Sequence, residues 1–180
     1  MKGRPWRWLT WARDPEHRRR LLLLRGAPVF AGLPRRLLSR LAVRFFEKTY
    51  AAGDVVFHEG EPGKALFLVL EGAVTISRIG PEGERILRSM GPGACFGEMA
   101  LIDDFPRSAT ARVTAPSSLL ILYKSDFDAL VEGHPRIALV TLRNLLHILA
   151  MYVRAATPPP QPVVQPAAAG AGAPGGRAPL

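Results

Sequence analysis

The residues best suited to chemistry in this 180-residue chain lie in one stretch, CFGEMALIDDFPRSAT, from Cys95 to Thr110. Glu98 supplies a carboxylate near its start and Arg107 a guanidinium near its end, with an apolar turn and a proline between them. A carboxylate accepts hydrogen bonds from hydroxyl groups, whereas the N–H fork of an arginine matches two oxygens of a phosphate at once. The pair therefore predicts a ligand that carries both a hydroxyl group and a negative charge.

The neighbours of this pair can complete an anion site. A short helix that begins at about Glu98–Met99 would point free backbone N–H groups toward its N-terminal end, where an anion is favoured. Gly97 has no Cβ and allows close approach of the backbone, and Ser108 adds a hydroxyl beside the guanidinium. Glu98 would then face a sugar hydroxyl. Because the sequence shows no lysine-bearing phosphate loop and no cluster of metal-binding acids, it predicts a nucleotide with few phosphates.

Short strands separated by turns must hold this stretch in place. Strands with clear boundaries are predicted at Val55–Phe57, Ala65–Leu70, Ala73–Ile79, Glu84–Ser89, Ala109–Val113 and Ser118–Tyr123. Glu71-Gly72 is predicted to be the turn between the second and third of them. With about eight strands in all, the fold class is mainly β with flanking helices, a jelly-roll-like β-roll whose interior can hold a pocket.

Helices are predicted on both sides of these strands. The first covers about Pro34–Phe46, where leucines recur at helical spacing. A short helix begins at Ser125, a good N-cap residue, and a long helix follows over Arg136–Ala155. The folded domain is therefore predicted to span residues 26–156.

The net charge of +9 is concentrated before this domain, because residues 1–25 hold eight of the 24 Lys and Arg residues. Trp6, Trp8 and Trp11 alternate with arginines in this basic arm, which suits a membrane interface or an acidic partner. The alternative is that the tryptophans pack on the domain. Residues 157–180 are mostly Pro, Ala and Gly and are predicted to be disordered.

The sequence also favours a cytoplasmic location. It has no uninterrupted apolar run of the roughly 18–20 residues that span a bilayer, and no signal peptide. A single cysteine, Cys95, excludes an intrachain disulfide.

Cys95–Thr110 resembles the phosphate-binding cassette of cyclic nucleotide-binding domains. This family includes the bacterial catabolite activator protein, the regulatory subunits of cAMP-dependent protein kinase, and nucleotide-gated channels. Its pattern is Phe-Gly-Glu, an apolar turn, and then an arginine followed by a small residue and alanine. The matching residues here are Phe96-Gly97-Glu98, Met99-Ala100-Leu101-Ile102 and Pro106-Arg107-Ser108-Ala109. The resemblance extends over about residues 28–154.

The resemblance implies a role for each residue of this stretch. Glu98 is expected to accept the ribose 2′-hydroxyl, and Arg107 to pair with the cyclic phosphate. The amides of Met99 and Ala100, with Ser108, would complete the phosphate site. A serine after the arginine favours cAMP, with cGMP as the alternative. No cofactor or metal is expected.

The long helix is predicted to serve a second chain as well as the nucleotide. One apolar stripe is formed by Leu142, Leu145, Leu149 and Tyr152, and another by Leu139, Leu146 and Val153. A helix of a monomer needs one such stripe, so the second predicts a homodimer, as in the bacterial relatives. Tyr152 is either an aromatic that stacks on the purine or an ordinary interface residue.

The functional interpretations to be compared are a receptor, a scaffold or dimerisation module, and an enzyme. The chain is expected to be a stand-alone receptor without a helix-turn-helix, so that it signals to an unidentified protein partner instead of reading a DNA sequence. Alternatively, it is a ligand-silent β-roll scaffold or a dimerisation module. An enzyme is not expected, because His17, His58, His134 and His147 are scattered and no nucleophile–base pair is evident.

Overall fold

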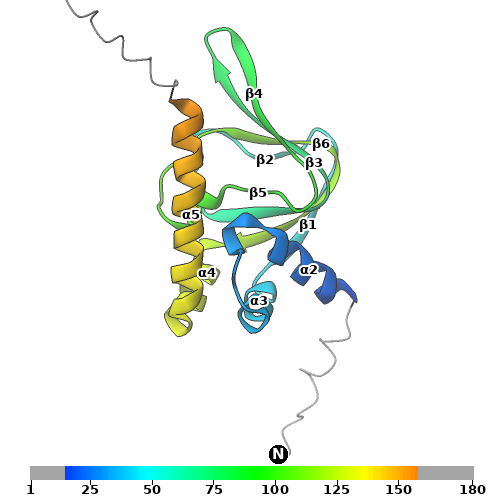
Figure 1. The fold of residues 1–180 in the computed structure, drawn as a ribbon. Helices are drawn as coiled ribbons and strands as arrows, with labels where there is room; N and C mark the ends of the chain where they lie inside the picture. Colours follow the sequence, from blue (N-terminus) through cyan, green and yellow to red (C-terminus); the bar gives the residue numbers. More distant parts are fainter. Residues whose placement is uncertain (1–14, 158–180) are drawn as a thin grey trace, which may run out of the picture.

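Two long antiparallel strands, β3 (Ala65–Gly80) and β6 (Thr110–Tyr123), pair with each other and form the frame of the fold. Four shorter strands attach to them: β1 (Phe46–Tyr50) and β2 (Val55–Phe57) on β6, and β4 (Gly83–Met90) and β5 (Cys95–Phe96) on β3. The computed structural model describes residues 15–157 (Figure 1). The predicted disorder of residues 158–180 and the placement of the three tryptophans lie outside this range.

A register shift near Gly72 bends this sheet into a roll of two layers. The part of β3 before the shift pairs with β5 and with the half of β6 to which β1 is also paired. The part of β3 after the shift pairs with β4 and with the half of β6 to which β2 is also paired (Figure 1). Gly72 has a φ of +86°, and a Cβ there would lie 2.1 Å from Ser117 Oγ. The predicted turn at Glu71-Gly72 is therefore wrong, because these residues form an irregularity inside one continuous strand.

Counting each half of β3 and β6 separately gives eight strand segments, the predicted number, but β1 and β5 are not among the six whose ranges were predicted. The predicted segments Ala109–Val113 and Ser118–Tyr123 are the two halves of β6. The mainly-β roll with flanking helices is thus confirmed, with fewer and longer strands than the turn residues suggested.

The first half of β3 is buried on both faces, which explains its unbroken apolar sequence. Alternate side chains point to opposite sides of a strand. Ala65, Phe67 and Val69 face the inside of the roll, and Leu66, Leu68 and Leu70 face the helices. This strand therefore joins the pocket side of the molecule to its helical side.

The helices gather on one side of the roll (Figure 1). They are α2 (Pro15–Gly26), the 3₁₀ helix η1 (Pro28–Phe30), α3 (Arg35–Ala42), α4 (Lys124–Gly133) and α5 (Pro135–Ala156). α2 lies in the second half of the predicted arm and buries Leu21 and Leu24, so the packed structure begins before residue 26.

Two helix boundaries differ from the sequence predictions. α3 ends at Ala42 because Phe46 already pairs with Ile121 as the first residue of β1. Ser125 is not the cap of α4, since that helix starts one residue earlier, after Tyr123, without a side-chain cap. The end of α3 is thus set by the pairing of β1 with β6, and the start of α4 by the end of β6, instead of by the local sequence.

α5 packs on the domain with one face and exposes the other. Ile137, Thr141 and Leu145 are buried, and the Asn144 side chain donates to the carbonyls of Val29 and Ala31 at 3.2 and 2.9 Å. The outer stripe consists of Leu139, Leu142, Leu146 and Val153. Two apolar faces were predicted and two exist, but Leu142 lies on the outer one and not beside Leu145.

By length and composition alone α5 could cross a bilayer, although Arg143 and Asn144 interrupt its apolar run. Its contacts with η1 and α4 are those of a helix that covers a globular domain.

Candidate functional site

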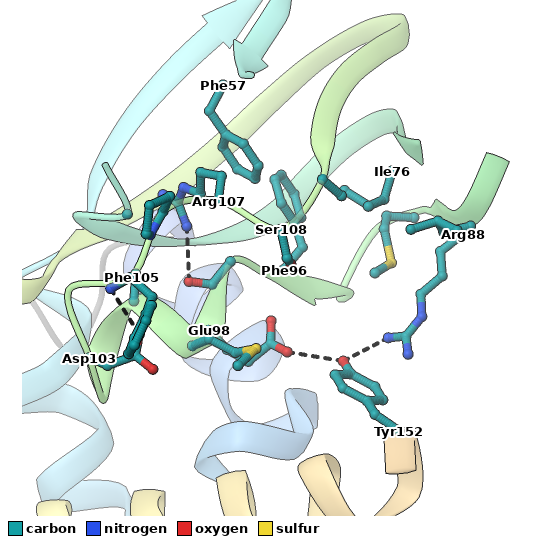
Figure 2. Close-up of a pocket in the computed structure, with 18 residues that line it drawn as sticks. Phe57, Ile76, Arg88, Phe96, Glu98, Asp103, Phe105, Arg107, Ser108 and Tyr152 are labelled. Atoms are coloured by element: carbon teal, nitrogen blue, oxygen red, sulfur yellow. Dashed lines mark hydrogen bonds between the residues drawn. The ribbon is translucent and has the colours of Figure 1, made fainter. Parts of the chain in front are cut away.

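A pocket of about 570 Å³ lies between the roll and the last turns of α5 (Figure 2). All nine predicted site residues line it: Phe96, Gly97, Glu98, Met99, Ala100, Arg107, Ser108, Ala109 and Tyr152. The structure thus brings the two ends of the sequence stretch 95–110, here called the cassette, to one cavity with the end of α5. The sequence did not predict the other lining residues, which are Phe57, Gly63, Ile76, Leu87, Arg88, Met90, Asp103, Phe105 and Pro106.

The third residue of the cassette, Gly97, is a glycine that no other residue can replace without strain. Gly97 has a φ of +69°, and a Cβ on it would lie 2.6 Å from Arg107 Nη1 and 3.2 Å from the Ala65 carbonyl oxygen. The left-handed backbone is costly for any residue with a Cβ. Gly97 therefore lets the arginine lie directly against the backbone of the cassette.

The predicted helix after Gly97 is only a four-residue 3₁₀ turn, η2 (Glu98–Leu101). So short a turn contributes little of the dipole expected of a full helix. The Ala100 amide, which was expected to face an anion, already donates to the Gly97 carbonyl at 3.3 Å. The positive character of the site consequently rests mainly on Arg107.

Arg107 is a half-buried cation whose hydrogen-bonding capacity is only partly used. Its Nη2 donates to the Ala65 carbonyl at 2.8 Å and its Nη1 to the Gly97 carbonyl at 3.3 Å, while its guanidinium lies 4.1 Å from the centre of the Phe57 ring. Its Nε is buried without a hydrogen-bond partner. None of the ion pairs formed within residues 15–157 involves this side chain.

Burial lowers the pKa of Arg107, and the charges of Glu98 and Glu61 only partly counter this effect. A spare buried donor on an unpaired cation is costly until an acceptor of negative charge meets it. The residues present therefore fit an anionic group at this end of the pocket.

The backbone around Arg107 is held by the turn at residues 59–61 and by β3. Its N–H donates to the Glu61 carbonyl at 2.7 Å, and its carbonyl accepts from the Gly60 amide at 2.9 Å. The next carbonyl, that of Ser108, accepts from Arg78 Nε at 2.9 Å, and Arg78 is also paired with Glu59 at 3.2 Å. These contacts fix where the arginine enters the pocket.

Glu98 and Tyr152 meet at the other end of the pocket. The Glu98 residue is only 7% exposed, and its Oε1 accepts a hydrogen bond of 3.0 Å from the Tyr152 hydroxyl (Figure 2). Arg88 Nη1 in turn donates to that hydroxyl at 2.6 Å, and the Arg88 guanidinium lies 4.0 Å from the centre of the tyrosine ring. A carboxylate, a phenol and a guanidinium from η2, α5 and β4 thus form one chain of hydrogen bonds.

Burial, followed by the charge of Glu98, raises the pKa of Tyr152, and Arg88 counters part of that rise. The phenol therefore stays protonated near neutral pH and acts as a donor to Glu98.

Arg88 is the member of this chain that sequence reasoning missed. It lies on β4, whose side chains are mostly exposed, so no periodic burial distinguishes it from Arg85 on the same strand. Only the β3–β4 pairing and the position of α5 reveal that it reaches Tyr152. Residues 15–157 contain no group of three or more His, Cys, Asp or Glu side chains placed to hold a metal ion.

The arrangement agrees with what known proteins show. Residues 47–134 match the cyclic nucleotide-binding domain family. The chain is 38% identical over 135 residues to the cyclic AMP receptor protein of Thermus thermophilus, covering 74% of this chain and 60% of that protein. It is 37% identical over 124 residues to a cyclic nucleotide-gated potassium channel of Mesorhizobium japonicum, covering 69% of this chain and 33% of the channel.

A solved structure supports the same assignment. The N-terminal domain of a transcriptional regulator from Streptomyces coelicolor superposes with a TM-score of 0.68 at 35% identity. The match covers 75% of this chain and 95% of that domain.

Proposed function

This chain belongs to the cyclic nucleotide-binding domain family, and we propose that it binds cAMP in the pocket and signals the binding to a partner protein through α5. The observation that carries the proposal is the half-buried, unpaired guanidinium of Arg107 in the same cavity as the carboxylate of Glu98. Arg107 offers a cation at one end of the cavity, and Glu98 offers an acceptor for a hydroxyl at the other. The family is regulatory, and we propose no catalytic role.

The ligand would lie along the axis from Arg107 to Glu98. The cyclic phosphate would accept from the spare Arg107 Nε, from the Ser108 hydroxyl and from the amide of Met99, since the Ala100 amide already donates to the Gly97 carbonyl. The ribose 2′-hydroxyl would donate to Glu98. The purine would then lie toward Tyr152 and the apolar side chains of Ile76 and Met90, which also line the pocket.

The choice of cAMP over cGMP rests on Ser108, which stands where the family places a threonine in members that prefer guanine. The relative from Thermus thermophilus named as a cyclic AMP receptor supports the same choice. cGMP is the alternative ligand, and titration with both nucleotides discriminates between them.

Signalling would use the outer face of α5. Leu139 and Leu146 on that face are 71% and 67% exposed, and apolar residues in such a stripe are stabilised by a second helix. We place a homodimer interface here, with the junction of α4 and α5 at Gly133–Pro135 as the hinge. A ligand shifts such an equilibrium only by its different affinity for the two arrangements.

The protein would act in the cytoplasm, with the basic arm as a second contact region. α2 continues the basic character of the arm, because its exposed residues include Arg18, Arg19 and Arg25. All three tryptophans lie within residues 6–11, so tryptophan fluorescence reports on the arm alone. A blue shift with vesicles containing phosphatidylglycerol, but not with pure phosphatidylcholine, would support peripheral membrane contact, and an unchanged spectrum would exclude it.

Calorimetric titration of the purified chain with cAMP, and with cGMP in parallel, tests the main proposal. We expect saturable binding of cAMP, tighter than that of cGMP, at one site per chain. Ligand at about 100 times its Kd should also add about 2.7 kcal/mol to the free energy of unfolding. If folded protein binds neither nucleotide, the ligand-silent scaffold or dimerisation module becomes the better account.

A further inference from the structure

α5 is fastened to the rest of the domain at two separate points. Near its middle, Asn144 donates to the carbonyls of Val29 and Ala31. Near its end, Tyr152 donates to Glu98 and accepts from Arg88. At 1.5 Å per residue the two points are about 12 Å apart along the helix. The second point lies inside the nucleotide pocket, whereas the first does not.

The contact at Tyr152 uses the carboxylate that the ribose is proposed to need. Tyr152 donates to Oε1 of Glu98, and a ribose 2′-hydroxyl is a donor of the same kind. Because Glu98 is only 7% exposed, few directions of approach to its oxygens remain open. The Tyr152 side chain also lines the pocket, so its hydroxyl and a bound ribose would compete for the same carboxylate from inside one cavity.

Arg88 strengthens this contact from the opposite side. It donates to the oxygen of Tyr152, which makes the tyrosine proton a better donor to Glu98, and it covers the face of the ring at 4.0 Å. Arg88 comes from β4 and Tyr152 from α5, so the two side chains close the pocket between the roll and the helix (Figure 2).

We propose that Glu98, Tyr152 and Arg88 form a latch that holds the end of α5 on the roll and that the ribose 2′-hydroxyl opens by replacing the Tyr152 hydroxyl on Glu98. The inference rests on the proposed function, since it needs a ribose at Glu98. Arg88 is then a positioning residue that acts through Tyr152. The exchange swaps one O–H donor for another, so no charge is created or buried.

Opening the latch would leave α5 held by Asn144 and by the buried side chains of Ile137, Thr141 and Leu145, while the turns beyond them would lose their polar contact with the roll. These turns carry Met151 and Val153, whose side chains are exposed. The ligand would thereby change the orientation of the outer face of α5 at the turns where a partner helix would pack. The hydroxyl of the sugar, and not only its phosphate, is therefore the signal that reaches the helix.

The test compares Tyr152→Phe and Arg88→Gln with matched controls, Tyr123→Phe and Arg154→Gln, whose side chains are exposed in the structure. Hydrogen exchange of residues 148–156 is measured without ligand, and calorimetry is run with cAMP and with 2′-deoxy-cAMP. Without ligand, the two latch variants should exchange faster in this segment than the wild type and both controls. Tyr152→Phe should bind cAMP about tenfold more tightly, the equivalent of one hydrogen bond of about 1.4 kcal/mol.

The deoxy analogue separates the latch from a general effect on the pocket. It has no 2′-hydroxyl to compete for Glu98, so Tyr152→Phe should leave its affinity within about twofold of the wild type. Equal tightening for both nucleotides, weaker binding of cAMP, or unchanged exchange in both latch variants would overturn the latch. If the wild type binds neither nucleotide, the proposed function fails and the latch fails with it; cAMP binding with any of the three preceding results refutes the latch alone.

Discussion

Replacing Arg107 with alanine separates its role in binding from its role in the fold. Without ligand, this side chain donates to two backbone carbonyls and stacks on Phe57, but its Nε has no partner. Each hydrogen bond contributes about 0.5–1.5 kcal/mol to stability and the cation–π contact about 0.5–1 kcal/mol. Removing a half-buried, unpaired cation also relieves a desolvation cost. We therefore expect the free energy of unfolding to fall by no more than about 1–2 kcal/mol.

Binding should suffer more than stability. With a phosphate at Arg107, the alanine variant leaves a partly buried anion without its cationic partner, which costs about 2–5 kcal/mol. At 1.4 kcal/mol per decade, this loss weakens cAMP binding by about 30-fold to several thousandfold. Arg107→Lys should fall between the wild type and the alanine variant, because it keeps the charge but not the fork.

Calorimetry gives the affinity and urea unfolding gives the stability of the same preparations. Arg112→Ala is a suitable control, because Arg112 Nη1 also donates to a backbone carbonyl, that of Gly53 at 3.1 Å, but does not line the pocket. The control should bind cAMP like the wild type. A change of less than about 0.5 kcal/mol in the affinity of Arg107→Ala would remove this residue from the ligand site and refute the reasoning.

Three further predictions concern the cassette, the helix and the helical side of the domain. Gly97→Ala should weaken cAMP binding in calorimetry and cost about 1–2 kcal/mol of stability, because a Cβ would lie 2.6 Å from Arg107 Nη1 in a left-handed backbone; Gly91→Ala, with open space around its Cβ, should do neither. Leu146→Lys should reduce the dimer fraction in light scattering, whereas His147→Lys, on an exposed neighbour outside the apolar stripe, should not. Burial by itself would raise the pKa of Glu47. This effect is outweighed by hydrogen bonds from Ser118 and Arg20 and by the charges of Arg20 and Arg19, so the pKa lies below the ordinary 4.5. The stabilisation from ionised Glu47 is therefore present above pH 4.5 and lost as the pH falls through the lower folded-state pKa, so Arg20→Ala should cost about 0.5–1 kcal/mol at pH 7 and progressively less as the pH is lowered below 4.5 in urea unfolding.

The cassette could be predicted from sequence because its chemistry is local. Gly97, Glu98 and Arg107 lie close together in the sequence, and their residue types limit what they can bind. Tyr152 was placed at the pocket through the resemblance, and its partner was not foreseen. A hydrogen bond between residues 98 and 152, with a third residue from β4, depends on how α5 lies across the roll, and no local pattern encodes that angle.

The errors in the fold have a related cause. Glu71-Gly72 has the composition of a turn, but β6 runs alongside and supplies pairing on both sides of the irregularity, so the chain continues as a strand. Likewise, α2 has a basic sequence that suggests an exposed arm, yet Leu21 and Leu24 pack into the core. Local composition predicts what a segment prefers, and the neighbouring segments decide what it does.

Both ends of the pocket are occupied by the protein's own hydrogen bonds before any ligand arrives. Arg107 is held by the Ala65 and Gly97 carbonyls, and Glu98 is held by Tyr152. Arg107 still has a free Nε to offer a ligand, whereas a hydroxyl that binds Glu98 must replace the contact from Tyr152, so the gain at Glu98 is the difference between the new contact and the old one. Ligand binding has different effects at the two ends of the pocket. The contacts of Arg107 lie within the roll, whereas the contact of Glu98 is made with α5.

A ligand that carries the phosphate but lacks the hydroxyl should thus bind without moving the helix. For a ligand with both groups, part of the free energy of its contact with Glu98 drives the conformational change. Only that part shifts the equilibrium of α5. Affinity and signalling are then separable in this domain. A nucleotide that binds well and signals poorly should be one whose sugar cannot donate to Glu98.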